Sequence, residues 1–339
     1  MEQTLRVCIY GATGYTASEL VRVLSKHPHV RITDLVSHST AGKKVSEVLP
    51  HLSPLMGDRA LSKEPSEDFD LAFLCLPHEA SMELVPRLID AGKKVIDLSG
   101  AYRIRNKEAY VEFYGFEHDH AELLKKSAYG LPELFRDSIR ESELVANPGC
   151  YPTSVLLALY PFLKEGVEVS DLVVHSLSGV SGAGRKVRQH FHYPEMEENF
   201  FAYSVTKHRH TPEMEDAIER LCGRSIKIRF TPTVVPASRG MLSTLYIKTE
   251  FRDVKALFED TYHGERFITL LDTPPMTKWV LGTNNCLLYT HYDERTSTAM
   301  VISAIDNLGK GASLQAVQNM NLMLGWDENL SIPAAPLFP

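Results

Sequence analysis

The run Gly11-Ala12-Thr13-Gly14-Tyr15-Thr16-Ala17 decides the fold, because it joins an apolar run, Leu5–Tyr10, to an amphipathic pattern over residues 14–26. A strand, a glycine-rich turn and a helix in this order are typical of a dinucleotide-binding unit, although glycines at a strand end can also form a plain turn. The first glycine permits a tight turn, the second lets backbone N–H groups approach a pyrophosphate, and a helix N-terminus favours an anion. We predict that the dinucleotide is contacted by Gly11, Thr13, Gly14, Tyr15 and Thr16.

Two domains are expected on either side of residue 148. Over residues 1–148, short apolar runs alternate with helical patterns, which predicts βαβ units and a Rossmann-type, doubly wound α/β domain. From residue 149 to 310, runs of alternating polarity predict an α+β domain with a largely antiparallel sheet. The runs expected as strands of that sheet are 172–177, 226–235, 242–249, 285–291 and 298–305.

Composition limits the possible partners of the chain. It has 339 residues, 44% hydrophobic content and a formal net charge of −7, with basic residues scattered along the chain. This balance favours a soluble globular protein and gives no support to nucleic-acid or anionic-membrane binding. No apolar run reaches the roughly 20 residues of a membrane span, and the start of the chain lacks a signal-peptide pattern. Five dispersed cysteines without a CxxC pair indicate a reducing compartment, so we expect a cytoplasmic protein.

The end of the second predicted strand indicates which dinucleotide is bound. NAD enzymes usually place an acidic residue there for the ribose hydroxyls. Here Asp34 lies too early, inside the strand, and the strand is followed by Ser37-His38-Ser39-Thr40 and by Lys43. Hydroxyls with a lysine suit a 2′-phosphate, so we predict NADP as cofactor, held in part by Ser37, Ser39 and Lys43. A polar loop without a ligand is the alternative.

The run Asn147-Pro148-Gly149-Cys150-Tyr151-Pro152 places a cysteine after a short strand and before a helix that we expect to begin near Pro152. The positive end of a helix favours thiolate over thiol. Gly149 leaves room for a planar carbonyl beside the sulfur. The other four cysteines lie in apolar or helical patterns and are interpreted as small core residues. Cys150 is therefore the candidate nucleophile.

Two histidines precede another helix in the run Lys207-His208-Arg209-His210-Thr211-Pro212-Glu213. Thr211 and Pro212 are typical of an N-cap and a first helical residue, so both rings are expected in extended backbone, facing opposite ways. Glu213 would hold His210 in an orienting or substrate-binding role, and His208 would face the thiol as the acid/base. Two histidines and a glutamate could instead bind a metal, but no further ligand of suitable spacing stands nearby, and we predict none.

Further polar contacts are expected from two loops. The small-residue run Ser178-Gly179-Val180-Ser181-Gly182-Ala183-Gly184-Arg185 follows a strand and can bring donors to an oxyanion or form a flexible turn. Ser181, Gly182 and Glu213 are our candidate substrate contacts in this domain. Arg103 and Arg105 follow a strand of the first domain, and a guanidinium suits a phosphate or carboxylate. Surface salt bridging is the alternative for either arginine.

Taken together, these motifs resemble the aldehyde-dehydrogenating branch that contains aspartate-semialdehyde dehydrogenase and N-acetyl-gamma-glutamyl-phosphate reductase. The shared marks are the 11–17 loop, the cysteine after Asn147-Pro148-Gly149, and the closing run 306–321, which begins Asp306-Asn307-Leu308-Gly309-Lys310-Gly311. The segments 148–153, 178–185 and 208–213 are more similar to the second member. Lys207 departs from the pattern, because many members have glycine before the first histidine.

The resemblance implies that an acyl phosphate is reduced to an aldehyde with NADPH, through a thioester on Cys150, in arginine biosynthesis if the second member is the right one. It implies that a C-terminal helix at about 311–325 completes the nucleotide-binding domain, with Asn319 reaching the nicotinamide carboxamide. It also implies that the open sheet packs in a homodimer or homotetramer. The alternatives are aminoadipyl-phosphate reductase, aspartate-semialdehyde dehydrogenase, or a non-catalytic NADP-binding regulator, which an intact Cys150, His208 and Arg103 oppose.

Overall fold

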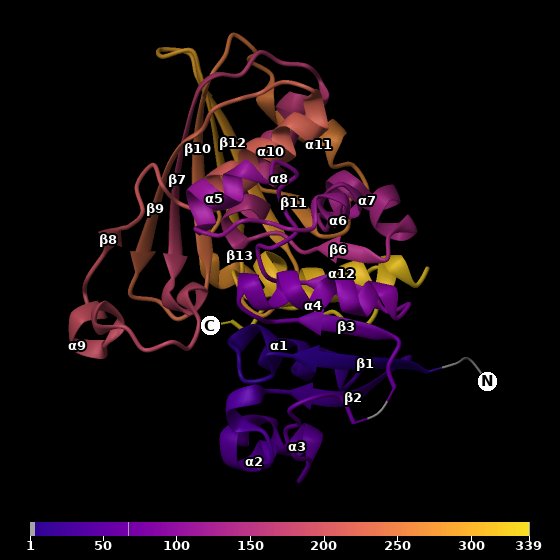
Figure 1. The fold of residues 1–339 in the computed structure, drawn as a ribbon. Helices are drawn as coiled ribbons and strands as arrows, with labels where there is room; N and C mark the ends of the chain where they lie inside the picture. Colours follow the sequence, from indigo (N-terminus) through magenta and orange to yellow (C-terminus); the bar gives the residue numbers. More distant parts are fainter. Residues whose placement is uncertain (1–3, 67, 339) are drawn as a thin grey trace. The chain divides into compact units, whose positions relative to one another are not determined.

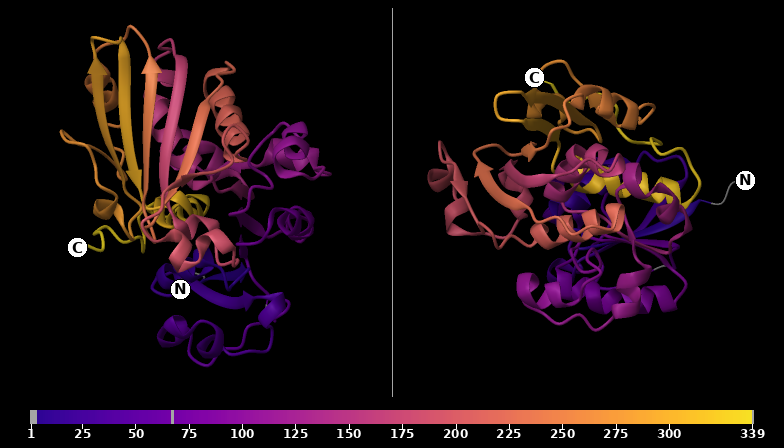
Figure 2. Two further views of the ribbon diagram at one scale, coloured as in Figure 1. Left: turned by 90° about the vertical axis from the view of Figure 1, so that its left-hand side faces the viewer. Right: turned by 90° about the horizontal axis from the view of Figure 1, so that it is seen from above.

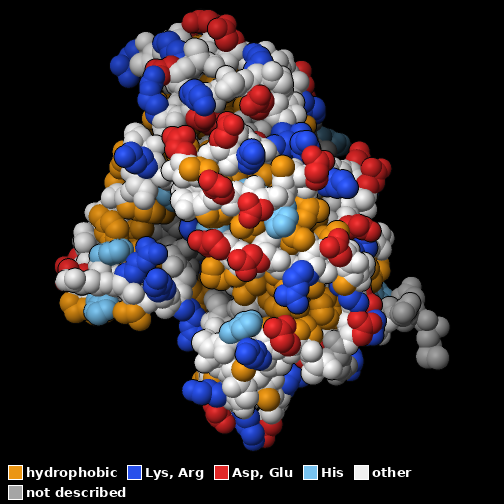
Figure 3. Space-filling view, viewed as in Figure 1, with side chains coloured by type: hydrophobic (Ala, Val, Ile, Leu, Met, Phe, Trp, Pro, Cys, Tyr) orange, Lys and Arg blue, Asp and Glu red, His pale blue; other side chains and the backbone are white. Residues whose placement is uncertain are grey.

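The computed structural model describes residues 4–66 and 68–338, which cluster in two compact units. Unit 1 comprises Met1–Arg105, His118–Pro148 and Ala312–Pro333, and unit 2 comprises Asn106–Glu117, Gly149–Gly311 and Ala334–Pro339. The segment Asn106–Glu117, which we expected within the first domain, thus clusters with unit 2. Acidic and basic side chains are interspersed over the face shown in Figure 3, in keeping with the scatter of charge along the sequence.

Unit 1 is built on a parallel six-stranded sheet with the order β2-β1-β3-β4-β6-β5. The order reverses at β1, which has β2 on one side and β3 on the other (Figure 1), so the predicted doubly wound class is confirmed. The strands are β1 (Leu5–Tyr10), β2 (Val30–Val36), β3 (Leu71–Leu74), β4 (Lys94–Asp97), β5 (Ala128–Tyr129) and β6 (Leu144–Ala146).

The helices of unit 1 include one from the far end of the chain. All ten residues of α12 (Leu314–Met323) are buried, and the helix packs against α1 and α7. Asn147 Nδ2 donates to the carbonyl of Ala312 at 3.0 Å, which joins the end of β6 to the segment leading into α12. The other helices are α1 (Tyr15–Leu24), α2 (Val45–Val48), α3 (Ser53–Met56), α4 (His78–Asp90), α6 (Ala121–Lys126) and α7 (Pro132–Glu141).

The glycine-rich loop lies where the strand order reverses. Gly11 has a φ of 74°, and a Cβ at this position would lie 2.1 Å from the carbonyl oxygen of Cys75, which follows β3. Gly14 is the N-cap of α1, whose first turn contains no acidic residue. Doubly wound sheets bind ligands at this reversal, and an uncompensated helix N-terminus favours an anion. The local geometry therefore matches that of a phosphate-binding loop.

Unit 2 contains a seven-stranded sheet with the order β11-β12-β13-β10-β7-β9-β8. The pairs β7–β9 and β11–β12 are parallel and the other pairs are antiparallel, so the predicted largely antiparallel sheet is confirmed. Figure 2 (left) shows its long strands side by side. They are β7 (Ser170–Gly179), β8 (Phe201–Ala202), β9 (Arg229–Val235), β10 (Met241–Lys248), β11 (Ile268–Leu270), β12 (Cys286–Asp293) and β13 (Thr298–Ile305).

One face of this sheet is covered by helices. Along β10, alternate residues from Met241 to Ile247 are buried, and α8 (Cys150–Lys164) packs on β10 and β13. Helix α10 (His210–Cys222) packs on α8, and α11 (Val254–Thr261) packs on α8 and β12. The unit also contains α5 (Glu108–Tyr114) and α9 (Tyr193–Met196). On the other face, side chains such as Tyr246 are half-buried or exposed, a pattern that indicates an interaction surface.

Several boundaries differ from those that the sequence predicts. The helix expected to begin near Pro152 begins at Cys150, and the strand expected over 226–235 begins at Arg229. The helix expected after a Thr211 cap begins at His210. Proline is tolerated anywhere in a first turn, because the N–H groups there have no partner within the helix. Pro152 and Pro212 therefore mark these helix starts to within two residues only.

The contact between Gly11 and Cys75 predicts a steric effect on stability. Gly11→Ala should lower the free energy of unfolding of unit 1, because the new methyl would meet the Cys75 carbonyl and the residue would also be strained by its positive φ. Gly57→Ala is the matched control, since Gly57 has a φ of 61° and nothing within 4 Å of the added Cβ. Urea unfolding should show a loss larger by about 1–3 kcal/mol for the Gly11 variant. Equal losses would contradict the close approach.

Candidate active site

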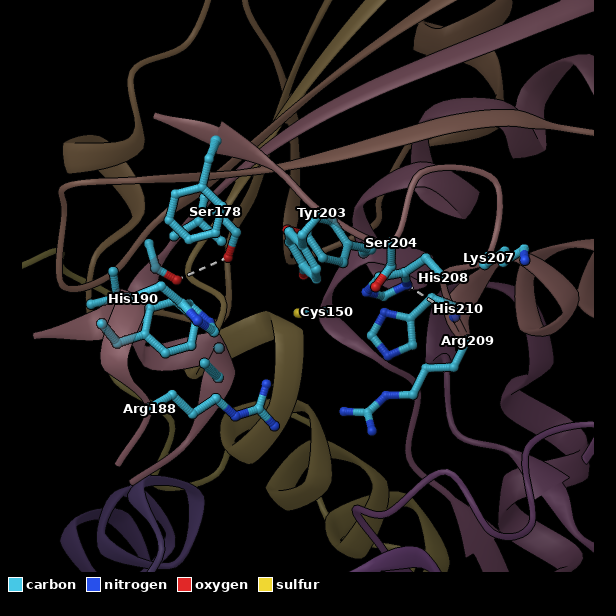
Figure 4. A pocket seen from close by; sticks show the side chains of 18 of the residues that line it. Cys150, Ser178, Arg188, His190, Tyr203, Ser204, Lys207, His208, Arg209 and His210 are labelled. Atoms are coloured by element: carbon cyan, nitrogen blue, oxygen red, sulfur yellow. Dashed lines mark hydrogen bonds between the residues drawn. The ribbon is translucent and has the colours of Figure 1, made fainter. Parts of the chain in front are cut away.

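Cys150 is the first residue of α8, and Gly149 is its N-cap. The thiol is half-buried and lines a pocket of about 440 Å³ (Figure 4). A helix of 15 residues directs the positive end of its dipole at its first turn, which favours an ionised sulfur. The helix that we expected to begin near Pro152 thus begins at Cys150 itself, so the cysteine lies closer to the helix start than predicted.

A buried carboxylate fixes the backbone in front of the cysteine. Glu213, in the first turn of α10, has a fully buried side chain, and its Oε1 accepts a hydrogen bond from the N–H of Gly149 at 2.8 Å. Its Oε2 lies 4.0 Å from Nε2 of His210. Glu213, which we expected to contact the substrate, therefore joins the start of α8 to the start of α10.

The inner face of α8 is held on the sheet by hydroxyl groups. Ser154, one turn after the cysteine, bonds Ser243 Oγ at 2.9 Å and Ser303 Oγ at 3.0 Å, and Ser176 bonds Ser243 at 2.7 Å. All four serines are fully buried. At the start of the helix, Gly311 approaches so closely that an added Cβ would lie 2.8 Å from the Cβ of Cys150. These contacts leave Cys150 little freedom to shift.

The pocket is lined by cations and by aromatic rings, and no carboxylate is among its lining residues. In Figure 4 the guanidinium groups of Arg188 and Arg209 point toward one another near Cys150. Lys207 also lines the pocket, but its ammonium group points away from Cys150 in Figure 4. Two guanidinium groups and a helix N-terminus near one thiol favour a small anionic ligand. The remaining lining residues include Phe113, Tyr151, Ser178, Gly182, His190, Phe191, Phe201, Tyr203, His208, His210 and Val234.

The two histidines lie side by side, so the prediction that their rings face opposite ways is wrong. Their ring centroids are 4.8 Å apart, and Nδ1 of His208 accepts the backbone N–H of His210 at 3.1 Å. The reason is the helix start at His210, which turns the backbone two residues earlier than the Thr-Pro signal indicated. Both rings line the pocket with Cys150.

His208 lies among aromatic rings that desolvate it. Tyr151, Tyr203 and Phe230 surround it with centroid distances of 5.3–5.5 Å. Burial, together with the neighbouring charge of Arg209, lowers the pKa of His208 to about 4. Because Nδ1 accepts a hydrogen bond, the neutral ring carries its proton on Nε2. The ring of His208 is therefore neutral at pH 7.

A pair of phenols borders the same ring. Tyr203 donates from its hydroxyl to that of Tyr151 at 3.2 Å. Burial raises the pKa of both groups, that of Tyr203 to about 12, so both phenols stay protonated at neutral pH. They can act in the pocket as hydrogen-bonding groups without adding charge.

The small-residue run after β7 forms a fixed wall of the pocket. The N–H of Val180 donates to Ala237 O at 2.8 Å, and that of Ser181 donates to Ser238 O at 3.2 Å. The Ser181 hydroxyl accepts from Asn307 Nδ2 at 2.9 Å. Gly182 lines the pocket, whereas Ser181 is turned to Asn307 and does not. The backbone N–H groups of Val180 and Ser181, which belong to the run that we considered for an oxyanion, are thus bonded within the unit.

Arg103 and Arg105 belong to unit 1. Arg103 is buried and donates from Nε to Asn147 O at 2.7 Å and from Nη2 to Leu98 O at 2.9 Å. It therefore braces the ends of β4 and β6, a role that the sequence did not indicate. Arg105 is exposed. The cations that lie beside the thiol are instead Arg188 and Arg209, which sequence analysis did not identify as ligands.

The residues expected to select the dinucleotide lie at the end of β2 in unit 1. Asp34 is buried inside the strand, and its Oδ1 accepts from both N and Oγ of Ser66 at 3.0 and 2.7 Å. Ser37 is buried and accepts from Thr40 Oγ1 at 2.8 Å, whereas Ser39 and Lys43 are exposed. The strand end therefore offers hydroxyls and a lysine, and its carboxylate is already engaged.

Asn319 of α12 is fully buried beside the ends of β5 and β6. Its Nδ2 donates to Gly130 O at 2.8 Å and to Asn147 Oδ1 at 3.0 Å. Its Oδ1 is buried and has no hydrogen-bond partner within residues 4–66 and 68–338. A buried amide acceptor of this kind suits a ligand that brings an N–H donor, as a carboxamide does.

Three further observations concern the described chain as a whole. Among the residues that the structure describes, no group of three or more His, Cys, Asp and Glu side chains has an arrangement that could hold a metal ion. In the same residues, no helix is long and apolar enough to cross a membrane. The five cysteines are all free.

Two family profiles match the chain in sequence order. One, described as the NAD binding domain of semialdehyde dehydrogenase, matches residues 6–142. The other, described as the semialdehyde dehydrogenase dimerisation domain, matches residues 150–307. Their border coincides with the change from the nucleotide-binding pattern to the second sheet, just before Cys150.

Similar proteins cover the whole chain. The N-acetyl-gamma-glutamyl-phosphate reductase of Aquifex aeolicus is 61% identical over 340 residues, with all of both chains covered. That of Magnetococcus marinus is 45% identical, again over 100% of both chains. Among solved structures, aspartate semialdehyde dehydrogenase II of Vibrio cholerae matches with a TM-score of 0.73 at 20% identity, covering 96% of this chain and 99% of its own. The Candida albicans aspartate semialdehyde dehydrogenase with NADP matches with a TM-score of 0.69 at 14% identity, covering 94% and 100%.

The buried position of His208 predicts a pH dependence of stability. Its pKa falls from 6.5 to about 4 in the folded chain, so between these values the unfolded chain binds more protons. The stabilisation from the neutral ring is complete above pH 6.5 and is lost as the pH falls. Between pH 7 and pH 5 this loss should be about 2 kcal/mol.

This loss can be measured through Trp279, which lies in unit 2 and is one of two tryptophans in the chain. In a Trp326→Phe background, the free energy of unfolding, measured in urea by the fluorescence of Trp279, should be lower at pH 5 than at pH 7. His208→Gln should remove most of the difference, whereas His291→Gln, at an exposed histidine of β12, should leave it intact. An unchanged pH dependence in the His208 variant would mean that this ring is not buried in its neutral form.

Proposed function

Because the chain belongs to the N-acetyl-gamma-glutamyl-phosphate reductase family, within the semialdehyde dehydrogenases, we propose that it reduces N-acetyl-gamma-glutamyl phosphate with NADPH to the 5-semialdehyde and phosphate. This reaction belongs to arginine biosynthesis. The observation that carries the proposal is Cys150, at the first residue of α8, in a pocket where the guanidinium groups of Arg188 and Arg209 lie near the thiol (Figure 4) and no carboxylate is in the lining. An acyl phosphate with a carboxylate is a small multivalent anion, which such a pocket suits.

The chemistry begins at the Cys150 sulfur. The thiolate attacks the acyl carbon, the carbon–oxygen bond to phosphate breaks, and a thioester remains on the cysteine while inorganic phosphate leaves. When bound, NADPH supplies the hydride that this thioester needs to reach the aldehyde level. When the resulting thiohemiacetal on Cys150 collapses, its carbon–sulfur bond breaks and its hydroxyl proton returns to the base of the site, so the aldehyde leaves and the thiolate is regenerated. Arg188 and Arg209 are suited to bind the phosphate and the carboxylate of the substrate.

The residues of unit 1 fit NADP. Gly11 leaves space that a Cβ would fill, Gly14 caps α1, and no acid in the first turn opposes a pyrophosphate. The engaged carboxylate of Asp34 and the exposed Ser39 and Lys43 favour a 2′-phosphate over free ribose hydroxyls. Thr13, Tyr15, Thr16 and Ser37 would complete this site, and Asn319 would accept the carboxamide N–H of the nicotinamide.

We assign the acid/base role to His210 in place of His208. His208 is neutral, and its Nδ1 is already bonded to the N–H of His210, so it can offer a donor at Nε2 but has no lone pair for the thiol proton. His210 has the Glu213 carboxylate 4.0 Å from its Nε2, which stabilises a proton taken up by this ring. His210 would thus accept the thiol proton and return it to the thiohemiacetal oxygen, while His208 and Tyr203 hold the substrate.

Assembly and location follow as further parts of the proposal. A profile described as a dimerisation domain matches unit 2, and the face of its sheet away from α8 presents side chains such as Tyr246. We propose that a second copy covers this face, in a homodimer or a homotetramer. Free cysteines suit the reducing cytoplasm, which is where we place the enzyme.

The reaction is most readily tested in reverse. The purified chain, with NADP, inorganic phosphate and N-acetyl-L-glutamate 5-semialdehyde, should form NADPH, and aspartate semialdehyde should be a much poorer substrate. Cys150→Ala should abolish turnover, while NADPH still binds with the affinity of the parent chain. Mass spectrometry of the parent with acyl phosphate and no NADPH should find an acyl adduct on the peptide that contains Cys150. Substantial turnover by Cys150→Ala would contradict the mechanism.

The two histidines can be separated by their kinetic effects. His210→Asn should lower kcat by about 10²–10⁴ and remove a titration from the pH dependence of kcat/KM. His208→Asn should mainly raise KM for the semialdehyde, because a neutral donor is lost and the proton acceptor stays in place. The matched control variant is Glu213→Gln, which keeps an oxygen acceptor for the Gly149 N–H. It should lower kcat by less than His210→Asn does. A larger loss of kcat in His208→Asn than in His210→Asn would reverse the assignment.

A further inference from the structure

The pocket has an apolar wall as well as its cations. Phe113, Phe191, Phe201 and Val234 line it together with Cys150. Phe191 and Phe201 lie 6.2 Å apart between ring centroids, and His190 packs on both at 4.3 and 5.7 Å. This part of the wall is therefore a supported aromatic surface. An acyl phosphate and a carboxylate do not account for it, because neither group is apolar.

Phe113 reaches the pocket from a distant part of the sequence. It lies on α5, in the segment Asn106–Glu117, which clusters with unit 2 although the chain on both sides of it belongs to unit 1. Helix α5 is fixed by Tyr110, which is fully buried and packs on Tyr114 and Phe116 with centroid distances of 5.2 and 5.5 Å. Val111, on the same helix, is 55% exposed. Tyr110, Phe113 and Tyr114 thus form the inward face of the helix.

The cations of the pocket set a second condition on its ligand. Arg188, Lys207 and Arg209 line the pocket, and its lining contains no carboxylate to balance a positive group on the ligand. A free amino group is an ammonium ion at neutral pH, and like charges in a partly desolvated site repel. An acylated amino group is neutral and planar, and its methyl and amide can lie on an aromatic face.

We propose that the wall of Phe113, Phe191, Phe201 and Val234 receives the N-acetyl group of the substrate, with Phe113 as a specificity-determining residue, and that Arg188 and Arg209 exclude the free amine. This inference rests on the proposed function, because it names how that site selects its substrate. It divides selection into two independent parts, an attraction that depends on an aromatic ring and a repulsion that depends on charge.

Three stable dicarboxylates separate the two parts. Glutarate has the two carboxylates alone, L-glutamate adds an ammonium group, and N-acetyl-L-glutamate adds the acetamido group in its place. Each is measured as a competitive inhibitor of the semialdehyde in the reverse reaction. For the parent chain, N-acetyl-L-glutamate should bind about 10-fold more tightly than glutarate, and L-glutamate should bind more weakly than glutarate.

Phe113→Ala should reduce the advantage of N-acetyl-L-glutamate over glutarate about 5- to 10-fold and leave the ratio of L-glutamate to glutarate unchanged. Arg188→Gln should do the opposite, because it weakens the repulsion of the ammonium and leaves the aromatic wall in place. Val111→Ala, on the exposed side of the same helix, should change neither ratio. Ratios are compared within one variant, so a general loss of affinity cancels.

Equal weakening of all three ligands by Phe113→Ala, or no change in either ratio, would overturn the assignment of Phe113. Phe113→Leu covers the case in which the alanine variant does not fold, since leucine keeps an apolar side chain but removes the planar face, and it should give a smaller loss of the same ratio. A ratio of L-glutamate to glutarate that Arg188→Gln leaves unchanged would overturn the charge argument. These measurements use a chain that already turns over N-acetyl-L-glutamate 5-semialdehyde, so failure of that turnover, and not of the ratios, would count against the proposed function.

Discussion

The hydrogen bond from Gly149 N–H to the buried carboxylate of Glu213 is the contact on which the site depends. It joins two helix starts, since α8 begins at Cys150 and α10 begins at His210. Both helices direct positive dipole ends at this place, and a carboxylate between them offsets part of that charge. If Glu213 were lost, a buried N–H and two converging dipoles would be left without their acceptor, which typically costs about 1–3 kcal/mol for the hydrogen bond alone.

The local charges of the pocket explain how a chain with a negative net charge can bind an anion. A net charge of −7 would repel a phosphorylated dicarboxylate at long range, but the charged groups near Cys150 are the guanidinium groups of Arg188 and Arg209 (Figure 4). Screening in physiological salt limits the reach of the distant charges to about 8 Å. Binding therefore depends on these two local charges. Glu213 is fully buried and is not part of the pocket lining, so it positions the backbone before the thiol without facing the ligand.

The parts of the site that could be predicted are those with a local physical signature. Gly11 and Gly14 stand between a strand and a helix, and Cys150 stands at a glycine-to-helix junction, so spacing alone made them candidates. The orientation of His208 and His210 was predicted wrongly because Thr211 and Pro212 are compatible with a helix that starts at any of several neighbouring residues. The helix starts two residues earlier than predicted, which is enough to change which way a ring faces.

Arg188, Phe201 and Phe113 could not be predicted, for a different reason. The first two lie in the segment between β7 and α10, which has only short elements and no periodicity from which to infer an inward face. Phe113 lies on a seven-residue helix that belongs to the other unit from its neighbours in sequence. Their place in the pocket is a property of tertiary packing, which no local pattern carries. Arg103 shows the converse. Its position at a strand end predicted that it binds a ligand, but its guanidinium donates to two backbone carbonyls and joins the ends of two strands.

Contacts of three kinds hold Cys150 in place before any substrate binds. Glu213 fixes the backbone before Cys150, the Ser154 hydroxyl fixes the next helical turn on the sheet, and Gly311 allows a neighbouring segment to pack against its Cβ. A reacting atom placed in this way has lost most of its freedom before the substrate binds, which removes an entropic cost from the barrier. The serine contacts, Gly311 and Glu213 keep the sulfur in place without any contribution from the cations and aromatic side chains of the pocket wall. Substitutions in the irregular segments that carry this wall can therefore change ligand selection while the position of the sulfur is kept.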